Sequence, residues 1–587
     1  MRLSRYLQAA TAALLMCAAM PHTASAAGFL QPLRHGVVFW QCDTPEQAVA
    51  ELAKVKADGF MLITLASWVW TLPKPGSQCE TVAQATLDWC DANDVTLFLL
   101  HNIQYGSPGE GGDLDQAWGN PLAAAPLLED WVRVLKGHRC VAGVILGNET
   151  SPRAGTRDAN PRWWSGFTQA MRDRYGEIGR LNDAWRTDFA SWEALDTPPE
   201  GSPGKLDLDR FATEAYGRFY GTLFDEVLRP ALGDLEYGTK TAGDPILHRR
   251  LPRFSMITWD DVLANYPQWR IKALCDIGRV LDRPVFNSEL HLYNDTYACN
   301  QSVAMSRYRY LTSALNGETT TASFAWGQWQ QNPETVAIHA ATPGILAELR
   351  RLEDAARAFA TVPAQVHVLL TPQIAAGDDT DAAAKPPAEA LYAEVAALGV
   401  PWRFVCEEDL DTVASGTLIL PADVGMEART ATQIAALPAA VAVVSVGEPT
   451  GLDEYGRPLP AVTAAALRQR ARVVTAIHDL ATAESDPGAP YNQTTTVDYL
   501  WWSAEKGHFR GPMLYPTLEA RRVRDGDGWL VAVINHATRG EPVVARLPWS
   551  AQSAATTATE LTGDQAQVAL TDTVAFAPLA VRLYRYR

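Results

Sequence analysis

The stretch Val141-Ala-Gly-Val-Ile-Leu-Gly-Asn-Glu-Thr-Ser-Pro152 predicts a buried strand that ends in polar side chains. Its first six residues are apolar without polar alternation, and three of them are β-branched, which is typical of a parallel strand covered on both faces. Gly147-Asn148-Glu149 follows at once, and Pro152 prevents simple continuation. Because α/β barrels place their chemistry at the carboxyl ends of strands, Glu149 is either a catalytic carboxylate or the cap of the next helix.

A second stretch of the same form favours the catalytic interpretation. Arg283-Pro-Val-Phe-Asn-Ser-Glu-Leu-His-Leu292 is another short buried-strand pattern, and it ends in a polar cluster around Glu289. Thr320-Thr-Ala-Ser-Phe-Ala-Trp-Gly-Gln-Trp329 follows and finishes in two tryptophans. Two carboxylates on strand ends of one barrel can flank a glycosidic bond, and indole rings offer flat faces to sugars. Trp326 and Trp329 are therefore candidate substrate contacts, with packing in the core as the alternative for Trp326.

Short apolar runs alternate with amphipathic segments over the first 358 residues or so, which predicts an eight-stranded parallel barrel. Residues 153–235 read as an interrupted helical segment within it. An open sheet carrying this helical insertion is the alternative architecture. The remaining predicted strands are Gly36–Trp40, Gly59–Thr64, Val95–Leu100, Leu235–Thr241 and the stretch around Met256–Asp260, of which the last is the weakest.

Two further domains are expected after the barrel. At Gln365 a new α/β pattern begins, which predicts a smaller three-layer domain of flavodoxin-like or amidotransferase-like form. Three β-rich segments near the C-terminus, Trp529–Ile534, Val543–Leu547 and Ala580–Tyr584, predict an antiparallel β-sandwich. The predicted domains are therefore the barrel over 27–360, the α/β domain over 361–482 and the sandwich over 491–587.

The first 26 residues predict a secretory signal peptide. Arg2 and Arg5 give a basic start, residues 9–20 are apolar, and Ala24-Ser25-Ala26 supplies small residues for cleavage. Cys17 raises the alternative of a lipoprotein, which Met16 before it disfavours. We expect export to the periplasm or the extracellular space, and no later segment predicts a membrane span.

Charge and cysteine content exclude several classes of partner. The chain has 50 Lys and Arg against 67 Asp and Glu, a formal net charge of −17, which argues against nucleic acid as a partner. An odd number of cysteines follows the signal peptide, so at least one is unpaired. With neither Cys-x-x-Cys nor His-Glu-x-x-His in the chain, we expect no metal and no cofactor. These cysteines are Cys42, Cys79, Cys90, Cys140, Cys275, Cys299 and Cys406.

From Gly36 onward the chain resembles the β-galactosidases of glycoside hydrolase family 42, within the clan of retaining barrel glycosidases. The resemblance extends in order over nearly the whole chain after the signal peptide. The resembling segments are Val37–Gln47, Trp68–Trp70 with Pro73–Gly76, Tyr175–Trp185 with Phe189 and Trp192, Thr258–Asp260 with Asn265–Pro267, and Gln328–Trp329. The middle domain resembles that family's trimerisation domain, which implies a homotrimer.

The resemblance implies roles for individual residues. Asn148 and Glu149 stand where the clan has its Asn-Glu pair, so Glu149 would be the acid/base, and Asn148 would bind the sugar 2-hydroxyl. Glu289 stands where the clan has its nucleophile. Beside the resemblance, Tyr266 is a candidate to orient that nucleophile, and His101 is a candidate to touch substrate hydroxyls, with ordinary packing in the core as the alternative for His101.

Three departures from the family pattern bear on specificity. The sixth-strand motif is interrupted by Asp261-Val-Leu-Ala264, and the residues around Glu289 and the third-strand end His101–Tyr105 match the family poorly. The expected activity is β-galactosidase-like hydrolysis with retention. A β-mannosidase, an endo-acting hydrolase, and a carbohydrate-binding protein without activity are the alternatives.

Overall fold

The computed structural model describes residues 28–587 except 30, 41, 242, 262–267, 293–301, 328–332, 376–386, 422–423, 481–490, 492–493, 498–512 and 551–552. The predicted signal peptide, Tyr266, Trp329 and Cys299 lie outside the described residues. Within the described ranges, each helix is too short or too polar to cross a bilayer.

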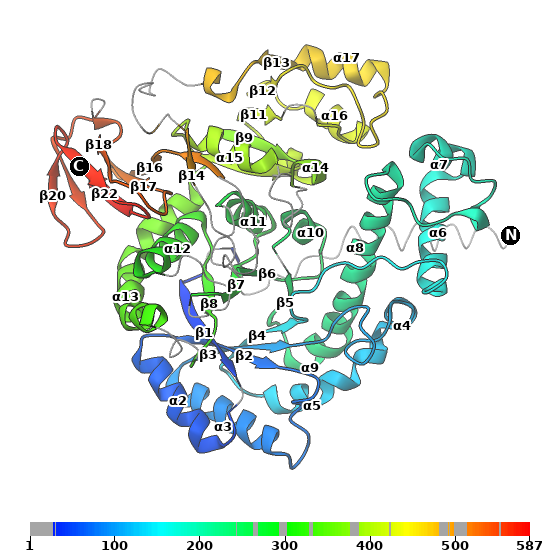
Figure 1. Ribbon diagram of the computed structural model, residues 1–587, viewed down its shortest axis with the longest axis horizontal. Coiled ribbons are helices and arrows are strands. Elements are labelled where there is room, and N and C mark those ends of the chain that lie inside the picture. The colour runs from blue at the N-terminus through cyan, green and yellow to red at the C-terminus, as the bar shows by residue number, and fades with distance from the viewer. Residues whose placement is uncertain are drawn as a thin grey trace.

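The first domain is a closed barrel of eight parallel strands, with β1 paired to β8 (Figure 1). Closure confirms the predicted barrel and rules out the open sheet. The stretch around Met256–Asp260, the weakest prediction, does form the sixth strand. The strands are β1 (Arg34–Trp40), β2 (Leu62–Ser67), β3 (Thr96–His101), β4 (Val141–Leu146), β5 (Glu236–Thr241), β6 (Ile257–Asp261), β7 (Val285–Leu290) and β8 (Thr320–Ser323).

Side-chain alternation along these strands separates two cores. One set of side chains, including Val38, Leu100 and Phe286, fills the barrel interior, and the alternate set packs against the surrounding helices. Gly36 is required on β1 because a Cβ there would collide with the backbone carbonyl of Leu62. Strand β8 ends at Ser323, before the tryptophans, so the predicted extension to Trp329 is wrong for the part that is described.

Helices cover the outside of the barrel, and several begin at clear caps. The Thr44 side chain accepts a hydrogen bond from the Gln47 amide at 3.2 Å, and Ser302 accepts one from the Met305 amide at 3.0 Å. The covering helices are α2 (Pro45–Ala57), α3 (Gln78–Asn93), α4 (Leu114–Gly119), η1 (Pro121–Ala124), α5 (Pro126–Leu135), α10 (Pro245–Arg249), α11 (Gln268–Leu281), α12 (Val303–Asn316) and α13 (Pro333–Thr361).

The segment between β4 and β5 is the predicted helical insertion. Its elements are α6 (Pro161–Tyr175), α7 (Ile178–Trp185), η2 (Trp192–Ala194), α8 (Pro203–Leu223), η3 (Phe224–Leu228) and α9 (Arg229–Leu232). An aromatic cluster holds it together: Trp163, Phe167 and Phe211 pack with ring centroids 4.9 to 6.1 Å apart.

The second domain is a parallel sheet in the order β10-β9-β11-β12-β13, which is the flavodoxin-like strand order. This confirms the predicted class. Its strands are β9 (Val366–Leu370), β10 (Trp402–Cys406), β11 (Gly416–Leu420), β12 (Val441–Val446) and β13 (Ala471–Val474). Its helices are α14 (Pro372–Ala375), α15 (Pro387–Ala396), η5 (Glu407–Thr412), α16 (Ala428–Ala435), α17 (Ala461–Arg470) and η6 (Ile477–Leu480).

The third domain is antiparallel, as predicted. A five-stranded sheet in the order β16-β17-β22-β19-β20 shares a core with the pair β18-β21, in which Val533, Ala545 and Phe576 meet. Its strands are β14 (Thr494–Val497), β15 (Met513–Pro516), β16 (Glu519–Asp525), β17 (Gly528–Ile534), β18 (Val543–Arg546), β19 (Thr557–Glu560), β20 (Gln567–Ala569), β21 (Thr573–Phe576) and β22 (Val581–Tyr586).

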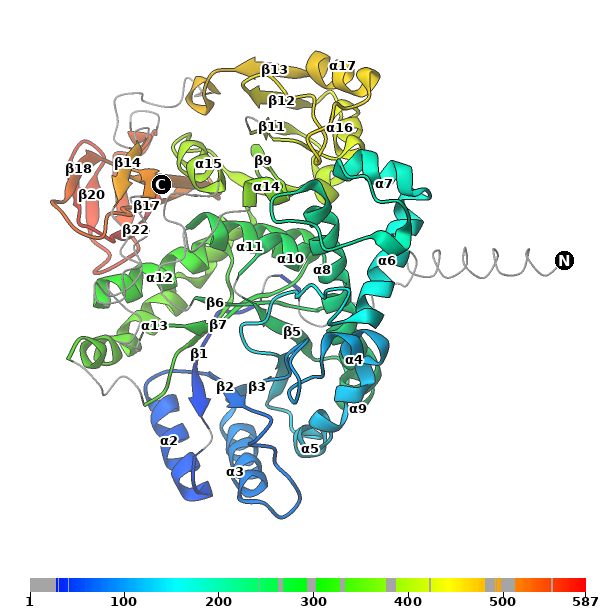
Figure 2. The same cartoon turned by 45° about the vertical axis from the view of Figure 1, so that its right-hand side comes forward.

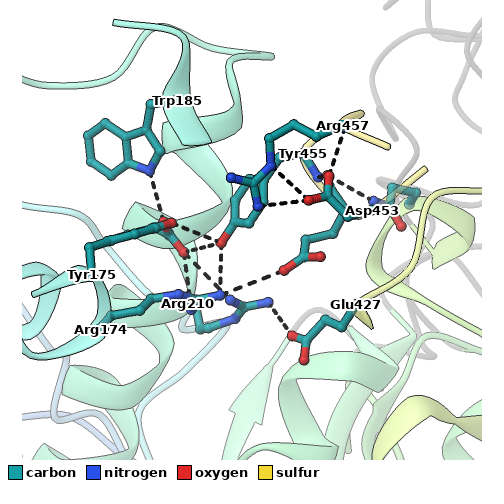
Figure 3. Close-up of polar contacts among 11 residues, drawn as sticks. Arg174, Tyr175, Trp185, Arg210, Glu427, Asp453, Tyr455 and Arg457 are labelled. Carbon is teal, nitrogen blue, oxygen red and sulfur yellow. Dashed lines mark hydrogen bonds and ion pairs between the residues drawn. The ribbon is translucent and has the colours of Figure 1, made fainter. Parts of the chain in front are cut away.

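A buried polar network fastens the second domain to the helical insertion, whose helices α6, α7 and α8 lie together at one side of the barrel (Figure 2). The fully buried carboxylate of Asp207, on α8, accepts hydrogen bonds from Tyr175 at 2.5 Å and from Tyr455 at 2.8 Å (Figure 3). Arg210 extends the network to Glu427 at 2.8 Å. The helical insertion and the second domain are therefore held together by charged and polar side chains.

Candidate active site

The loop after β4 presents Glu149 at the open end of the barrel. Gly147 and Glu149 both have left-handed backbone conformations, with φ of 78° and 51°. Such a conformation is unfavourable for a glutamate, so neighbouring contacts must hold it. The Glu149 side chain is 49% exposed, which leaves its carboxyl group accessible from the barrel mouth.

Backbone and side-chain hydrogen bonds from both neighbouring strands hold this loop. The Gly147 amide donates to the His101 carbonyl at 2.8 Å, and the Asn148 amide donates to Asn102 Oδ1 at 3.1 Å. On the other side, the Thr150 amide donates to the Lys240 carbonyl at 2.9 Å. The ends of β3 and β5 thus fix the position of Glu149.

Glu289 lies near the end of β7, buried inside the barrel mouth. Its Oε1 atom lies 2.8 Å from His291 Nε2, and its Oε2 atom contacts the ammonium group of Lys240. Burial lowers the pKa of His291 to about 3, with Lys240 acting in the same direction. The imidazole is therefore neutral at ordinary pH, and its Nε2–H donates to the Glu289 carboxylate.

Lys240, on β5, connects both predicted catalytic carboxylates, and the sequence prediction missed it. Its fully buried Nζ atom donates to Asn148 Oδ1 at 2.7 Å and lies 3.7 Å from Glu149 Oε1, in addition to contacting Glu289. Burial lowers the pKa of Lys240, while the carboxylates of Asp260 and Glu149 oppose this shift. Because Glu149 and Glu289 both reach one nitrogen atom, their carboxyl groups lie close together.

Asp260, at the end of β6, is a third carboxyl group in this cluster. Its Oδ2 atom is 3.9 Å from Lys240 Nζ, and neither of its oxygens accepts a hydrogen bond from another residue in the described ranges. Burial raises the pKa of Asp260 to about 7, and Glu149 adds to this shift while Lys240 opposes it. Asp260 therefore changes protonation state near neutral pH.

The predicted role of His101 in substrate binding is wrong. His101 is fully buried on the outer side of β3, where Nδ1 lies 3.3 Å from Ser67 Oγ and Nε2 lies 3.1 Å from the Leu127 carbonyl. The physical reason is strand alternation: Leu100 faces the barrel interior, so the next side chain faces the helices.

The predicted role of Trp326 as a sugar platform is also wrong. Its indole lies in the outer core against Phe60 and His339, and its Nε1–H donates to Glu51 on α2 at 2.9 Å. The aromatic side chain that faces the barrel mouth from this segment is Phe324. Its ring stacks on His291 with centroids 4.4 Å apart. The predicted contacts by Tyr266 and Trp329 lie outside the described residues.

One group of side chains in the described ranges has metal-ligand chemistry, but it lies at the opposite end of the barrel. Ligand atoms of Asp91, His138 and Cys140 lie within 4.8 Å of one another, between the end of α3 and the start of β4. Both oxygens of Asp91 already accept hydrogen bonds, one from His138 Nδ1 and one from the Cys140 amide, each at 2.7 Å. Asp91 thus anchors the turn that enters β4.

The arrangement at the mouth supports acid–base and nucleophilic chemistry on a small neutral group. One carboxyl group, Glu149, is exposed to an incoming substrate. The other, Glu289, is buried and held by two donors, Lys240 and His291. A pair of this kind can protonate one atom and attack another across a single bond.

Comparison with known proteins identifies the fold. No protein-family model and no curated protein sequence matches the chain. A β-galactosidase from Bacillus circulans sp. alkalophilus superposes with a TM-score of 0.64 at 13% identity, covering 95% of this chain and 99% of that one. An exo-carrageenase from Bacteroides ovatus superposes with a TM-score of 0.64 at 15% identity, covering 97% of this chain and 85% of that one. A β-galactosidase from the haloarchaeon Halorubrum lacusprofundi superposes with a TM-score of 0.63 at 16% identity, covering 94% of this chain and 98% of that one. The fold resemblance predicted from the sequence is confirmed: over nearly its whole length, the chain has the fold of these glycosidases.

Proposed function

We propose that the protein is a retaining β-glycosidase that acts on β-galactosides. The observation that carries the proposal is the position of Glu149 and Glu289, at the ends of β4 and β7, where both carboxyl groups reach the Lys240 ammonium group. Retaining enzymes need their two carboxyl groups roughly 5 to 5.5 Å apart, whereas inverting enzymes leave room for a water molecule. Two carboxylates that share one ammonium group favour the shorter separation.

In the first step, Glu289 attacks the anomeric carbon of the bound sugar while Glu149 gives its proton to the glycosidic oxygen. The bond between the anomeric carbon and that oxygen breaks, and an ester bond between the sugar and Glu289 forms. The leaving group departs as an alcohol. Glu149 is then a carboxylate, and the sugar is held with inverted configuration.

In the second step, Glu149 takes a proton from a water molecule, which attacks the anomeric carbon. The ester bond to Glu289 breaks, so Glu289 returns to its carboxylate form and the sugar leaves with its original configuration. Esterification of Glu289 removes a negative charge from the site between the two steps. Glu149 is thus the acid of the first step and the base of the second.

Lys240 and His291 position the nucleophile in this scheme. Both donate to Glu289, one to each carboxylate oxygen, which fixes the plane of the carboxylate and favours its ionised form. Asn148 Oδ1 accepts a hydrogen bond from Lys240, and among the described residues its Nδ2 makes a single long contact, 3.5 Å from Glu149 Oε1. Nδ2 is therefore the group that would donate to the sugar 2-hydroxyl.

The choice of a β-galactoside rests on the resemblance and on the named activity of three neighbouring structures, which are β-galactosidases. Another sugar on the same scaffold is the second candidate, because the neighbours also include an exo-carrageenase. Export through the predicted signal peptide and trimerisation through the second domain are part of the proposal. An exported enzyme of this kind would meet saccharides outside the cytoplasm.

A panel of 4-nitrophenyl β-glycosides tests the proposed function. We expect the galactoside to have the highest kcat/KM, and Glu289→Gln to lose hydrolysis of every substrate while keeping its fold. Proton NMR of the first-formed sugar should show the β-anomer before mutarotation. Release of the α-anomer first, or no hydrolysis of any β-glycoside by the wild-type protein, would overturn the proposal.

A further inference from the structure

Three tryptophans form an offset stack at the rim of the barrel mouth. Trp40 ends β1, and Trp68 and Trp70 follow β2. The ring centroids of Trp40 and Trp68 are 6.3 Å apart with planes 12° from parallel, and those of Trp68 and Trp70 are 5.5 Å apart with planes 3° from parallel. We name these three residues the tryptophan ladder. Such offset stacking is a favourable geometry for aromatic rings.

The tryptophan ladder begins at the candidate active site. Trp40 and Phe324 pack against the interior core of the barrel, with their rings edge to face at 5.9 Å. Phe324 in turn stacks on His291, which donates to Glu289. An unbroken row of rings thus leads from the side chain that holds the predicted nucleophile to the outer surface.

The outer end of the tryptophan ladder is open to solvent. Trp40 and Trp68 are half-buried, whereas Trp70 is 69% exposed, so the accessible ring area increases outward. A large exposed aromatic ring leaves apolar surface in water, and when it adjoins a pocket such a surface is typical of a binding site. Trp70 is therefore placed to be covered by a ligand that also occupies the mouth.

The turn that carries Trp68 and Trp70 is fixed by its own hydrogen bonds. Thr71 Oγ1 accepts from the Trp68 amide at 2.9 Å and donates to the Trp68 carbonyl at 3.1 Å. The Thr71 amide also donates to that carbonyl at 2.9 Å. A preformed turn loses little conformational entropy when a ligand binds, which is the requirement for a stacking platform.

We infer that the tryptophan ladder is a carbohydrate subsite, and that the substrate is an oligosaccharide whose additional sugar units extend from the mouth over Trp70. This inference rests on the proposed function. A sugar ring has an apolar face of C–H groups and a polar edge, so it can cover an indole face while its hydroxyls stay in water. Continuity with Phe324 and His291 favours the substrate over a second protein chain as the occupant.

Binding to an inactive protein tests the inference without requiring turnover. In a Glu289→Gln background, calorimetry would measure affinity for β-linked galacto-, gluco- and manno-oligosaccharides of increasing length, with the monosaccharides as references. We expect affinity to rise with length in at least one series. Trp70→Ala should weaken binding of the longer sugars by about 3- to 10-fold and leave the monosaccharide unchanged. Trp70→Phe, which keeps a flat ring, should retain most of the increase of affinity with sugar length.

Two controls distinguish a sugar subsite from a general loss of binding and from an interface between protein chains. Trp529→Ala removes a half-buried tryptophan from the third domain and should leave all sugar affinities unchanged. Sedimentation of the Trp70→Ala protein should give the wild-type mass. Any of three results would overturn the inference. The first is an affinity that does not depend on sugar length in any series, and the second is an increase of affinity with length that survives Trp70→Ala. The third is a change of mass in Trp70→Ala without a change in sugar binding. Length-dependent binding by a protein that hydrolyses no glycoside would instead contradict only the proposed function.

Discussion

Lys240, on β5, forms a buried ion pair with Glu289, on β7, in the barrel mouth. The same ammonium group also donates to Asn148, next to Glu149. A single cation therefore links the two predicted catalytic carboxylates to the residue proposed to bind the sugar. We therefore expect the charge of Lys240, as well as the two glutamates, to be required for activity.

Replacing Lys240 by Met should lower kcat/KM by at least about 100-fold. The substitution keeps most of the length of the side chain but leaves Glu289 buried without its cation, and removing one partner of a buried ion pair costs about 3–5 kcal/mol. The ionised form of Glu289 should then require a higher pH, so the acidic limb of the pH–rate profile should move upward. Lys54→Met, which breaks a pair with Glu51 on the exposed side of α2, is the matched control and should have no effect. An unchanged pH profile in Lys240→Met would show that the ion pair does not set the ionisation of the nucleophile.

The protonation of Asp260 should make stability depend on pH. Burial raises the pKa of Asp260 to about 7 in the folded protein, above the usual value of 3.8. The unfolded chain therefore loses this proton at a lower pH than the folded protein does. The contribution of this group to stability should therefore be fully present below about pH 4, fall as the pH rises from about 4 to about 7, and stay constant above that. Asp260→Asn should have a higher melting temperature than wild type at pH 8, and the difference in melting temperature should be smaller at pH 5. A gain that is the same at both pH values would contradict the assignment.

Phe324 and Trp326 should respond differently to substitution. Trp326→Phe removes a buried hydrogen bond to Glu51 and part of the outer core, so it should lower the melting temperature by the equivalent of about 1–3 kcal/mol and leave KM unchanged. Phe324→Leu removes the ring that stacks on His291, so it should raise KM or lower kcat with a smaller loss of stability. Thermal denaturation and steady-state kinetics of both variants check this. A KM effect confined to Trp326→Phe would restore Trp326 as a sugar contact.

Asp207 should stabilise the contact between the helical insertion and the second domain. Asp207→Ala leaves Tyr175, Tyr455 and Arg174 without their shared acceptor, so we expect a loss of about 2–4 kcal/mol. Differential scanning calorimetry would detect it as an earlier or separate transition. Asp209→Ala, two residues along the same helix, breaks only an exposed pair with Lys205 and should change stability by less than about 1 kcal/mol. Equal effects of the two substitutions would mean that the network contributes little.

The positions of the two glutamates at strand ends could be predicted from the sequence, because strand patterns locate them. Val141–Leu146 was predicted with the limits that the structure gives to β4, and both Glu149 and Glu289 lie at strand ends. Lys240 was missed, although a signal was present. A lysine inside a predicted barrel strand, Leu235–Thr241, is surrounded by other strands, so it needs a buried anion as partner.

The aromatic residues were harder to place, because their direction depends on where a strand ends. The predicted strand over 320–329 would have carried Trp326 to the mouth. In the structure β8 ends at Ser323, which puts Phe324 in the mouth and Trp326 among the helices. The outward direction of His101, by contrast, followed from alternation with Leu100 and could have been predicted. The stack of Trp40, Trp68 and Trp70 joins two strand ends, a proximity that strand patterns do not specify.

The stereochemistry of azide rescue tests the roles of the two glutamates most directly. Glu289→Gly removes the nucleophile. On a β-glycoside with a good leaving group, added azide should therefore attack from the vacated face and give the α-glycosyl azide. Glu149→Ala should still form the ester with Glu289, and azide should then displace it to give the β-glycosyl azide after two inversions. NMR of the isolated products distinguishes the two anomers, which damage to the fold cannot imitate. The structure predicts the α-azide from Glu289→Gly and the β-azide from Glu149→Ala; the same anomer from both variants, or near-normal hydrolysis by Glu289→Gly, would contradict it.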